Sequence, residues 1–228
     1  MSDLDIEIVN QKYPQLGRIK VHDPASKGFP MLATVNRDLW KTKLNRIYDP
    51  RTNPNQCHGE CTGCANAMML NSAGNRVTGQ VLGMDYAHKV YSDASANDPF
   101  EGAWPPTDTG SSGIAAAKAA QKFGMGGEYR WIFGGADGVI EAVMSGRVVS
   151  AGTWWHEGMM ERDDKLFIHP TGPRVGGHQF VIRGYNKPMD AAVIRCWWGG
   201  FRDAYLLRPV LDDLLRAGGD AHVQDRKF

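Results

Sequence analysis

The pattern of hydrophobic and polar positions changes character near the middle of the chain. In the first half, residues 65–70 directly after Cys61, residues 113–123 and residues 136–145 are rich in helix-forming residues. We therefore predict three helices there, the first beginning at Cys61 and the third ending at Gly146.

The second half shows short apolar segments separated by glycine, proline and aspartate turns. This pattern predicts strands over residues 147–151, 179–182, 192–195 and 204–207. A last helix, residues 210–216, is expected to end at the glycine pair 218–219. Helices followed by strands indicate an α+β chain with two lobes.

Domain boundaries follow from the same pattern. Residues 1–53 are punctuated by glycine and proline and predict an extended, strand-poor leader or arm. Residues 54–223 form the predicted domain, with a helical lobe at about 54–145 and an antiparallel, β-barrel-like lobe at about 146–223. Residues 224–228 are expected to be a solvated tail.

Composition excludes several classes of function. The chain has 42% hydrophobic residues and a net charge of +1, so neither nucleic acid nor an anionic membrane is expected as a partner. It lacks an apolar run of roughly 20 residues and an apolar segment near its acidic start, so we expect synthesis in the cytoplasm without a signal peptide. Cysteines there are thiols, ligands or catalysts more often than disulfides.

Cys57, Cys61 and Cys64 lie within eight residues of one another. Cys61 stands at a loop-to-helix junction, where the helix N-terminus lowers the pKa of a thiol. Such a thiolate becomes a nucleophile when an imidazole can meet it. His178 follows two glycines and opens an apolar strand, which predicts a thiolate–imidazolium pair with Cys61.

Two other interpretations of the cluster remain open. The C-x3-C-x2-C spacing of Cys57, Cys61 and Cys64 suits an iron–sulfur cluster, or zinc with His58 or Cys196 as the fourth ligand. The chain lacks the alternating strand–helix units of radical-enzyme barrels. Alternatively, Cys57 and Cys64 are simply small buried apolar residues, the interpretation that we prefer for these two.

Several separated blocks, in order, resemble the papain-like cysteine peptidases, and more closely the short forms of actinobacteria and their bacteriophages. The blocks are Gln56-Cys57-His58-Gly59-Glu60-Cys61-Thr62-Gly63, Thr107-Asp108-Thr109-Gly110-Ser111-Ser112-Gly113, Gly152-Thr153-Trp154-Trp155, Gly176-Gly177-His178, Gly184-Tyr185, Trp198-Gly199 and Gly219-Asp220-Ala221. Leu16-Gly17-Arg18 also looks like the leader of those forms. The resemblance covers most of the chain and implies a papain-like two-lobed fold that needs no cofactor.

The resemblance also implies catalytic roles. Cys61 would attack the scissile carbonyl, and His178 would protonate the leaving amine. Gln56 and the backbone N–H of Cys61 would line the oxyanion hole.

The resemblance further implies how substrate is held. Gly110, Ser111 and Ser112 would bind the substrate backbone, and Trp198 would shield the imidazole. Plainer alternatives are a turn and helix cap at residues 110–112, a core position for Trp198 and a surface loop for Gln56.

Three positions depart from the family pattern. Cys196 stands where the family has the asparagine that orients the imidazole, and a thiol is a weak hydrogen-bond partner. Gln56 is one residue closer to the nucleophile than the family spacing. Glu60 places a carboxylate beside the thiol, which is expected to raise its pKa.

These observations predict a thiol-dependent peptidase that acts on a peptide or protein. One alternative is a catalytically decayed papain-like fold that serves as a structural or binding component of a phage virion, with phage structural proteins as partners. A second is a metal site at Cys57, Cys61 and Cys64. The leader could be a propeptide lying through the cleft, an arm that docks on a partner, or a wrapper that adds a strand.

Overall fold

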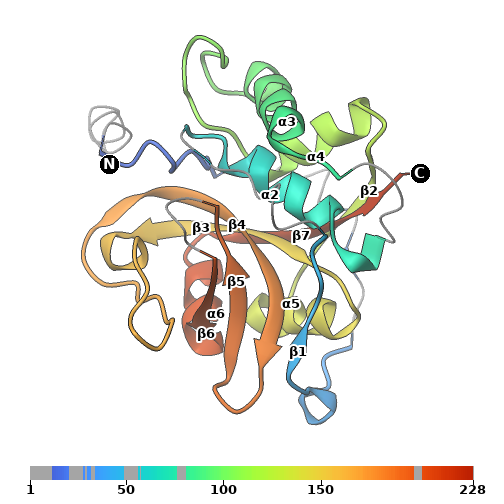
Figure 1. Cartoon of the computed structure of the whole chain (residues 1–228), viewed down its shortest axis with the longest axis vertical. Helices are drawn as coiled ribbons and strands as arrows, with labels where there is room; N and C mark the ends of the chain where they lie inside the picture. The colour runs from blue at the N-terminus through green and yellow to red at the C-terminus, as the bar shows by residue number, and fades with distance from the viewer. Residues whose placement is uncertain are drawn as a thin grey trace.

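In the computed structural model, the fold divides into a helical part and a curved antiparallel sheet (Figure 1). The residues that the structure describes are 12–20, 28, 30–31, 34–48, 56, 58–75, 81–197 and 202–227.

The helical part consists of α2 (Cys61–Leu70), α3 (Met84–Asn97) and α4 (Gly113–Lys122). All ten residues of α2 are buried, because the helix lies between α3 and α4 on one side and the sheet on the other (Figure 1). The small residues of α2 allow its neighbours to pack closely around it. A Cβ added at Gly63 would lie 2.3 Å from the carbonyl oxygen of Ala87 in α3, so the two helix backbones approach closely there.

The strands of the sheet follow the order β2-β7-β3-β4-β5-β6, and a short β1 pairs with β4. Every pairing is antiparallel. The strands are β1 (Lys43–Leu44), β2 (Gly126–Trp131), β3 (Val149–His156), β4 (Arg174–Asn186), β5 (Ala191–Arg195), β6 (Asp203–Leu207) and β7 (Asp220–Arg226). β7 joins the two parts, since it pairs with β2 beside the helices and with β3 in the main sheet.

Two further helices, α5 (Gly135–Met144) and α6 (Arg208–Arg216), pack against each other and against the sheet. Pro209 stands in the first turn of α6, where its missing N–H is not needed. Leu211 and Leu214 are the buried residues of that helix, and they extend the core under β3.

The structure confirms the predicted α+β class and most of the predicted elements. The helices after Cys61, at 113–123, at 136–145 and at 210–216 are present, as are the four predicted strands. The sequence analysis missed α3, β2 and β7. β7 runs to Arg226, into the stretch that we assigned to the tail.

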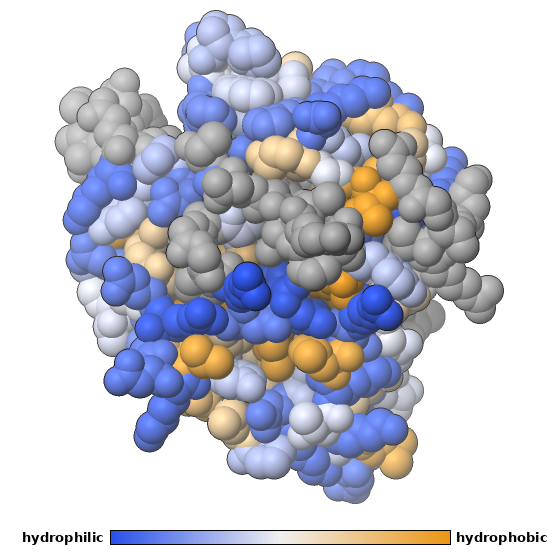
Figure 2. Space-filling view, viewed as in Figure 1, coloured by the Kyte–Doolittle hydropathy of each residue, from blue (hydrophilic) through white to orange (hydrophobic). Residues whose placement is uncertain are grey.

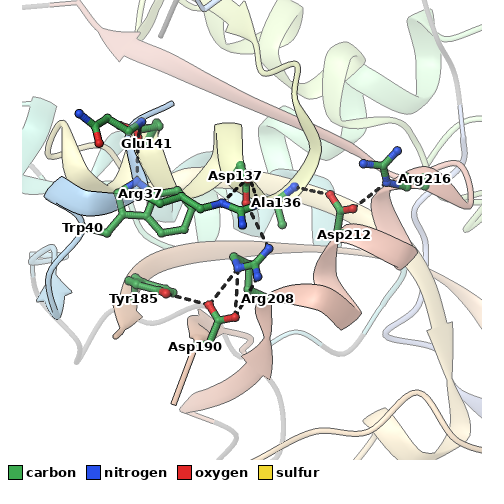
Figure 3. Close-up of polar contacts among 11 residues, drawn as sticks. Arg37, Trp40, Ala136, Asp137, Glu141, Tyr185, Asp190, Arg208, Asp212 and Arg216 are labelled. Atoms are coloured by element: carbon green, nitrogen blue, oxygen red, sulfur yellow. Dashed lines mark hydrogen bonds and ion pairs between the residues drawn. The ribbon is translucent and has the colours of Figure 1, made fainter. Parts of the chain in front are cut away.

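One part of the leader, residues 36–45, is attached to the sheet and α5; we call it the anchor segment. Its 3-10 helix Arg37–Leu39 precedes β1, and Trp40 donates a hydrogen bond to Glu141 at 2.7 Å. Figure 3 shows how Arg37 and Arg208 converge on Asp137 of α5, while Arg208 also pairs with Asp190. These ion pairs join the anchor segment, α5 and α6.

The visible face in Figure 2 is mainly hydrophilic, with hydrophobic residues in separate groups. The most exposed large hydrophobic residues include Leu39 and Leu44 of the anchor segment. In the described part of the chain, each helix is too short or too polar to cross a membrane.

Candidate active site

Cys61 begins α2 and is completely buried. Burial is the main reason why its pKa is raised, to about 11. Hydrogen bonds with the backbone of Gln179 in β4 and of Gly17 in the leader act in the opposite direction, as does the charge of Arg18. In this covered state Cys61 is a neutral thiol at pH 7.

His178 is the neighbour of Gln179 in β4, so the fold brings it to the segment that contacts Cys61. Its ring is fully buried among Trp155, Phe180 and Trp197, with ring centroids 4.7, 6.1 and 6.2 Å away. Burial lowers the pKa of His178 well below its ordinary value, so the imidazole is neutral. The ion pair expected from the sequence therefore stays a prediction for an uncovered site.

Residues 15–20 of the leader, which we call the cleft segment, cover Cys61. The N–H of Arg18 donates to the carbonyl oxygen of Gly177 at 3.0 Å, and the N–H of Ile19 donates to that of Ser111 at 2.7 Å. The N–H of Ser111 donates to Gly17 at 2.7 Å. The segment thus lies between the loop that precedes α4 and strand β4, along the boundary visible in Figure 1.

Two glycines permit this close approach. A Cβ at Gly17 would lie 1.9 Å from the carbonyl oxygen of Gly59. Gly110 has φ +76°, and a Cβ there would lie 2.2 Å from the carbonyl oxygen of Gly17. Any side chain at either position would push the cleft segment off the residues beside Cys61.

The three residues expected to bind a peptide backbone have separate roles here. Ser111 holds the cleft segment through its backbone, and its hydroxyl donates to Asp98 at 2.8 Å. Ser112 caps α4 by accepting from the N–H of Ala115 at 3.2 Å, which agrees with the helix-cap alternative. Gly110, with its positive φ, forms the turn that leads into Ser111.

Gln56 is buried and not part of a surface loop. Its side-chain amide donates to the carbonyl oxygen of Gln15 at 2.6 Å and to that of His58 at 2.7 Å. Gln15 belongs to the cleft segment. The amide therefore points at a peptide carbonyl that lies in the cleft, as an oxyanion-hole donor would.

Of the remaining cysteines, the structure describes Cys64 and Cys196. Cys196 is buried, and this burial is the main reason why its pKa is raised; the nearby Cys61 acts in the same direction. Cys64 lies in the hydrophobic core, as we preferred. Cys57 and Trp198 fall outside the described residues. Within the described ranges, no three histidine, cysteine or acidic side chains form a group that could hold a metal ion.

The carboxylate near Cys61 that the structure identifies is Asp108, which the sequence analysis did not single out. Asp108 raises the pKa of Cys61, whereas the carboxylate of Glu60 lies 2.7 Å from the His88 ring. Asp108 accepts hydrogen bonds from the N–H of Gly59 at 2.8 Å and from the hydroxyl of Tyr91. It thus fixes the loop immediately before Cys61.

The sequence analysis also missed a buried ion pair. Arg18 of the cleft segment forms an ion pair with Asp220 at the start of β7, and their side chains are 1% and 4% exposed. The two residues are separated by 202 positions in the chain, so no local pattern could have associated them.

The fold of the chain is similar to those of several solved structures. The chain is similar to xylellain, a cysteine protease from Xylella fastidiosa, with a TM-score of 0.71 and 13% identity over 93% of this chain and 96% of that one. It is also similar to a procathepsin B from Trypanosoma congolense, with a TM-score of 0.60 and 9% identity over 100% and 99% of the chains.

A third similar structure is the bromelain protease of Ananas comosus in complex with the E64 inhibitor, with a TM-score of 0.55 and 11% identity over 73% of this chain and 89% of that one. Neither a family model nor a curated protein matches the sequence. The chain therefore has the α+β fold of the papain-like cysteine proteases.

Proposed function

We propose that the protein is a cysteine peptidase with Cys61 as the nucleophile and His178 as the general acid and base, held inactive by its own cleft segment. The observation that carries the proposal is the peptide backbone lying on Cys61. Ser111 and Gly177 bind that backbone through hydrogen bonds that any extended peptide could make.

Removal of the cleft segment would change the charge state of the site. Water would reach Cys61 and reduce the burial that raises its pKa, while the N-terminus of α2 and the backbone of Gln179 would still favour the thiolate. The proton would pass to His178, whose own pKa would rise once its ring faced the thiolate and water.

The reaction then follows from the positions of the groups. The Cys61 thiolate attacks the scissile carbonyl, and the amide of Gln56, which now donates to Gln15, donates to the oxyanion. His178 gives its proton to the leaving amine, and the carbon–nitrogen bond breaks to leave a thioester. His178 next takes a proton from water, which attacks the thioester and releases the acid.

The cleft segment is held in the site like a bound peptide. Its bridge with Ser111 is parallel, between Arg18 and Ser111. One of the similar structures is itself a procathepsin, a precursor form.

Labelling with an epoxysuccinyl inhibitor tests this proposal. Gly17→Ala places a methyl group against Gly59 and should lift the cleft segment without changing any residue of the site. Gly28→Ala is the matched control, since a Cβ there meets no atom within 4 Å. We expect Cys61 to be labelled at least about 10-fold faster in Gly17→Ala than in wild type or the control, with mass-spectrometric mapping of the site.

The histidine is tested in the same background. Adding His178→Ala should reduce labelling of Cys61 to the rate of an ordinary solvent-exposed thiol, with free cysteine in the same buffer as the reference. The proposed peptidase function would be contradicted if labelling of Cys61 stayed slow in Gly17→Ala, or if His178→Ala left the labelling rate unchanged.

One observation favours a second function. Cys196 stands where the resemblance places an orienting asparagine, so catalysis could have decayed while the fold was kept as a binding or structural part of a phage particle. The virion setting rests on sequence resemblance alone. Loss of labelling together with normal folding of Gly17→Ala would favour this alternative.

A further inference from the structure

The carboxylate of Asp108 connects two loops of the helical part that touch the cleft segment. Its Oδ2 accepts a hydrogen bond from the N–H of Gly59 at 2.8 Å, and its Oδ1 accepts one from the hydroxyl of Tyr91. The same hydroxyl accepts a hydrogen bond from the N–H of Gly110 at 2.9 Å. One carboxylate and one phenol thus join the loop before α2 to the loop before α4.

Tyr91 holds the inner end of this network. Its side chain is fully buried on α3, and its ring centroid lies 5.5 Å from that of Trp104. A Cβ at Gly63 of α2 would lie 3.3 Å from the Cβ of Tyr91, so the tyrosine starts from the place where the two helices pack closely. The position of the hydroxyl is therefore set by the contact of α2 with α3.

Gly59 lies between the carboxylate and the cleft segment. A Cβ there would lie 2.6 Å from Oδ1 of Asp108 and 3.2 Å from the Cα of Gly17. The N–H of Gly59 is directed at the carboxylate, so its backbone is fixed from one side while the other side contacts the peptide in the cleft. A shift of Asp108 would move the surface on which that peptide lies.

Asp108 also acts on the thiol of Cys61 through its charge. Burial is the main cause of the raised pKa of Cys61, and the charge of Asp108 adds to it. The backbone of Gln179 and of Gly17 and the charge of Arg18 act in the opposite direction. The charge of Asp108 alone works against a thiolate, so any benefit to the site comes through its hydrogen bonds.

We propose that Asp108 is a positioning residue, which acts with Tyr91 to hold the loops at Gly59 and Gly110 in the arrangement that receives a peptide backbone. The effect on reactivity rests on the proposed peptidase function. The hydrogen bonds and the charge can be separated, because Asp108→Asn keeps an acceptor for Gly59 and loses the charge, whereas Asp108→Ala loses both.

Hydrogen exchange at the N–H groups of Gly59 and Gly110, measured by NMR, tests the network without any reaction. In the Gly17→Ala background, Tyr91→Phe should speed exchange at Gly110 at least about 10-fold, because the N–H loses its acceptor. Asp108→Ala should speed exchange at Gly59, and Asp108→Asn should not. Tyr86→Phe is the matched control, since Tyr86 lies on the same helix and its hydroxyl donates elsewhere, to Asn66 at 3.0 Å.

Two thiol reagents then separate position from charge. Labelling by the peptide-like epoxysuccinyl inhibitor should slow about 10- to 100-fold in Tyr91→Phe and Asp108→Ala, and stay near the background rate in Asp108→Asn and Tyr86→Phe. Iodoacetamide needs the thiolate but no backbone contact. With it, Asp108→Asn should lower the pH midpoint of Cys61 alkylation by about 0.5–1 unit, because a like charge is removed. Asp164→Asn, at an exposed carboxylate, should leave the midpoint unchanged.

Thermal unfolding establishes that each variant folds, and Tyr91→Phe, which keeps the buried ring, carries the test if Asp108→Ala does not fold. Unchanged exchange or unchanged epoxysuccinyl labelling in Tyr91→Phe would overturn the inference, as would a midpoint that Asp108→Asn does not move. Normal labelling that depends on His178 in all variants leaves the peptidase and removes Asp108 from it. Altered exchange and a shifted midpoint, with labelling that ignores His178→Ala, overturn the peptidase and keep Asp108 as the residue that sets the loops.

Discussion

Cys196 is the residue whose chemistry departs furthest from the asparagine that the family resemblance places at its position. It is a buried thiol near Cys61, and it follows β5, the strand next to the one that carries His178. A thiol accepts hydrogen bonds weakly, so it can do little to hold an imidazole in one tautomer.

Under the proposed function, Cys196→Asn should therefore increase the peptidase activity of the protein once the cleft segment is lifted. In the Gly17→Ala background we expect kcat to rise about 10- to 100-fold, because an amide oxygen can accept from the imidazole. The larger polar side chain should lower the free energy of unfolding by about 1–3 kcal/mol. Cys64→Ala, at a buried thiol in the core, is the control for kcat; an unchanged kcat in Cys196→Asn would show that His178 needs no orienting residue.

Residues with a strong local pattern were predictable from the sequence, and residues that act across the chain were not. Cys61 could be found because a helix follows it, and His178 because an apolar strand follows it. Arg18 and Asp220 meet from opposite ends of the chain, and Asp108 acts through a loop. Their roles depend on tertiary contacts that no short pattern encodes.

At the scale of elements, α2 is held by the contact of its backbone with α3. A Cβ at Gly63 would lie 2.3 Å from a backbone oxygen and not against the end of a flexible side chain, so neither helix can give way easily. This approach also positions the N-terminus of α2, where Cys61 stands.

Gly63→Ala should separate the two helices. We expect the free energy of unfolding to fall by about 1–3 kcal/mol in urea denaturation, despite the better helix propensity of alanine. Gly83→Ala, just before α3, places its methyl group in open space and should change stability by less than about 1 kcal/mol. Equal effects of the two substitutions would argue against a close helix contact.

Two of the elements that the sequence analysis missed, α3 and β7, share a physical cause. α3 carries several polar residues along its length, and only five of its residues are buried. β7 buries Asp220, His222 and Gln224, so its buried positions look like those of a surface strand. Both elements are more polar than α4, α5 and the central strands, whose apolar residues made them recognisable.

At the scale of the whole molecule, buried imidazoles link stability to pH. His222 in β7 is fully buried, and this burial lowers its pKa to about 4; His178 is shifted in the same direction. The unfolded chain binds protons on these groups at higher pH than the folded one does. Acid therefore favours unfolding, and the stability present above about pH 6.5 is lost as the pH falls towards 4.

For His222 alone the expected loss is on the order of 3 kcal/mol between pH 7 and pH 4. His222→Gln should flatten this dependence in chemical denaturation experiments across that range. His156→Gln, at a residue that is not buried, serves as the reference. A slope that is the same for both variants would mean that His222 is not the group responsible.

The leader is held at several places, among them the cleft segment over Cys61, the contact of residues 30–31 with Trp131, and the anchor segment on α5 and the sheet. Under the proposed function, the cleft segment of the intact chain would compete with substrate as a tethered ligand, at a local concentration that dilution cannot change. A single cut between Lys20 and Pro30 would leave residues 30–31 and the anchor segment in place and would separate the cleft segment from the rest of the chain. Its occupancy would then depend on total protein concentration. The cut protein should gain specific activity on simple dilution, whereas the intact protein should not. Proteolysis would thus make the inhibition depend on protein concentration.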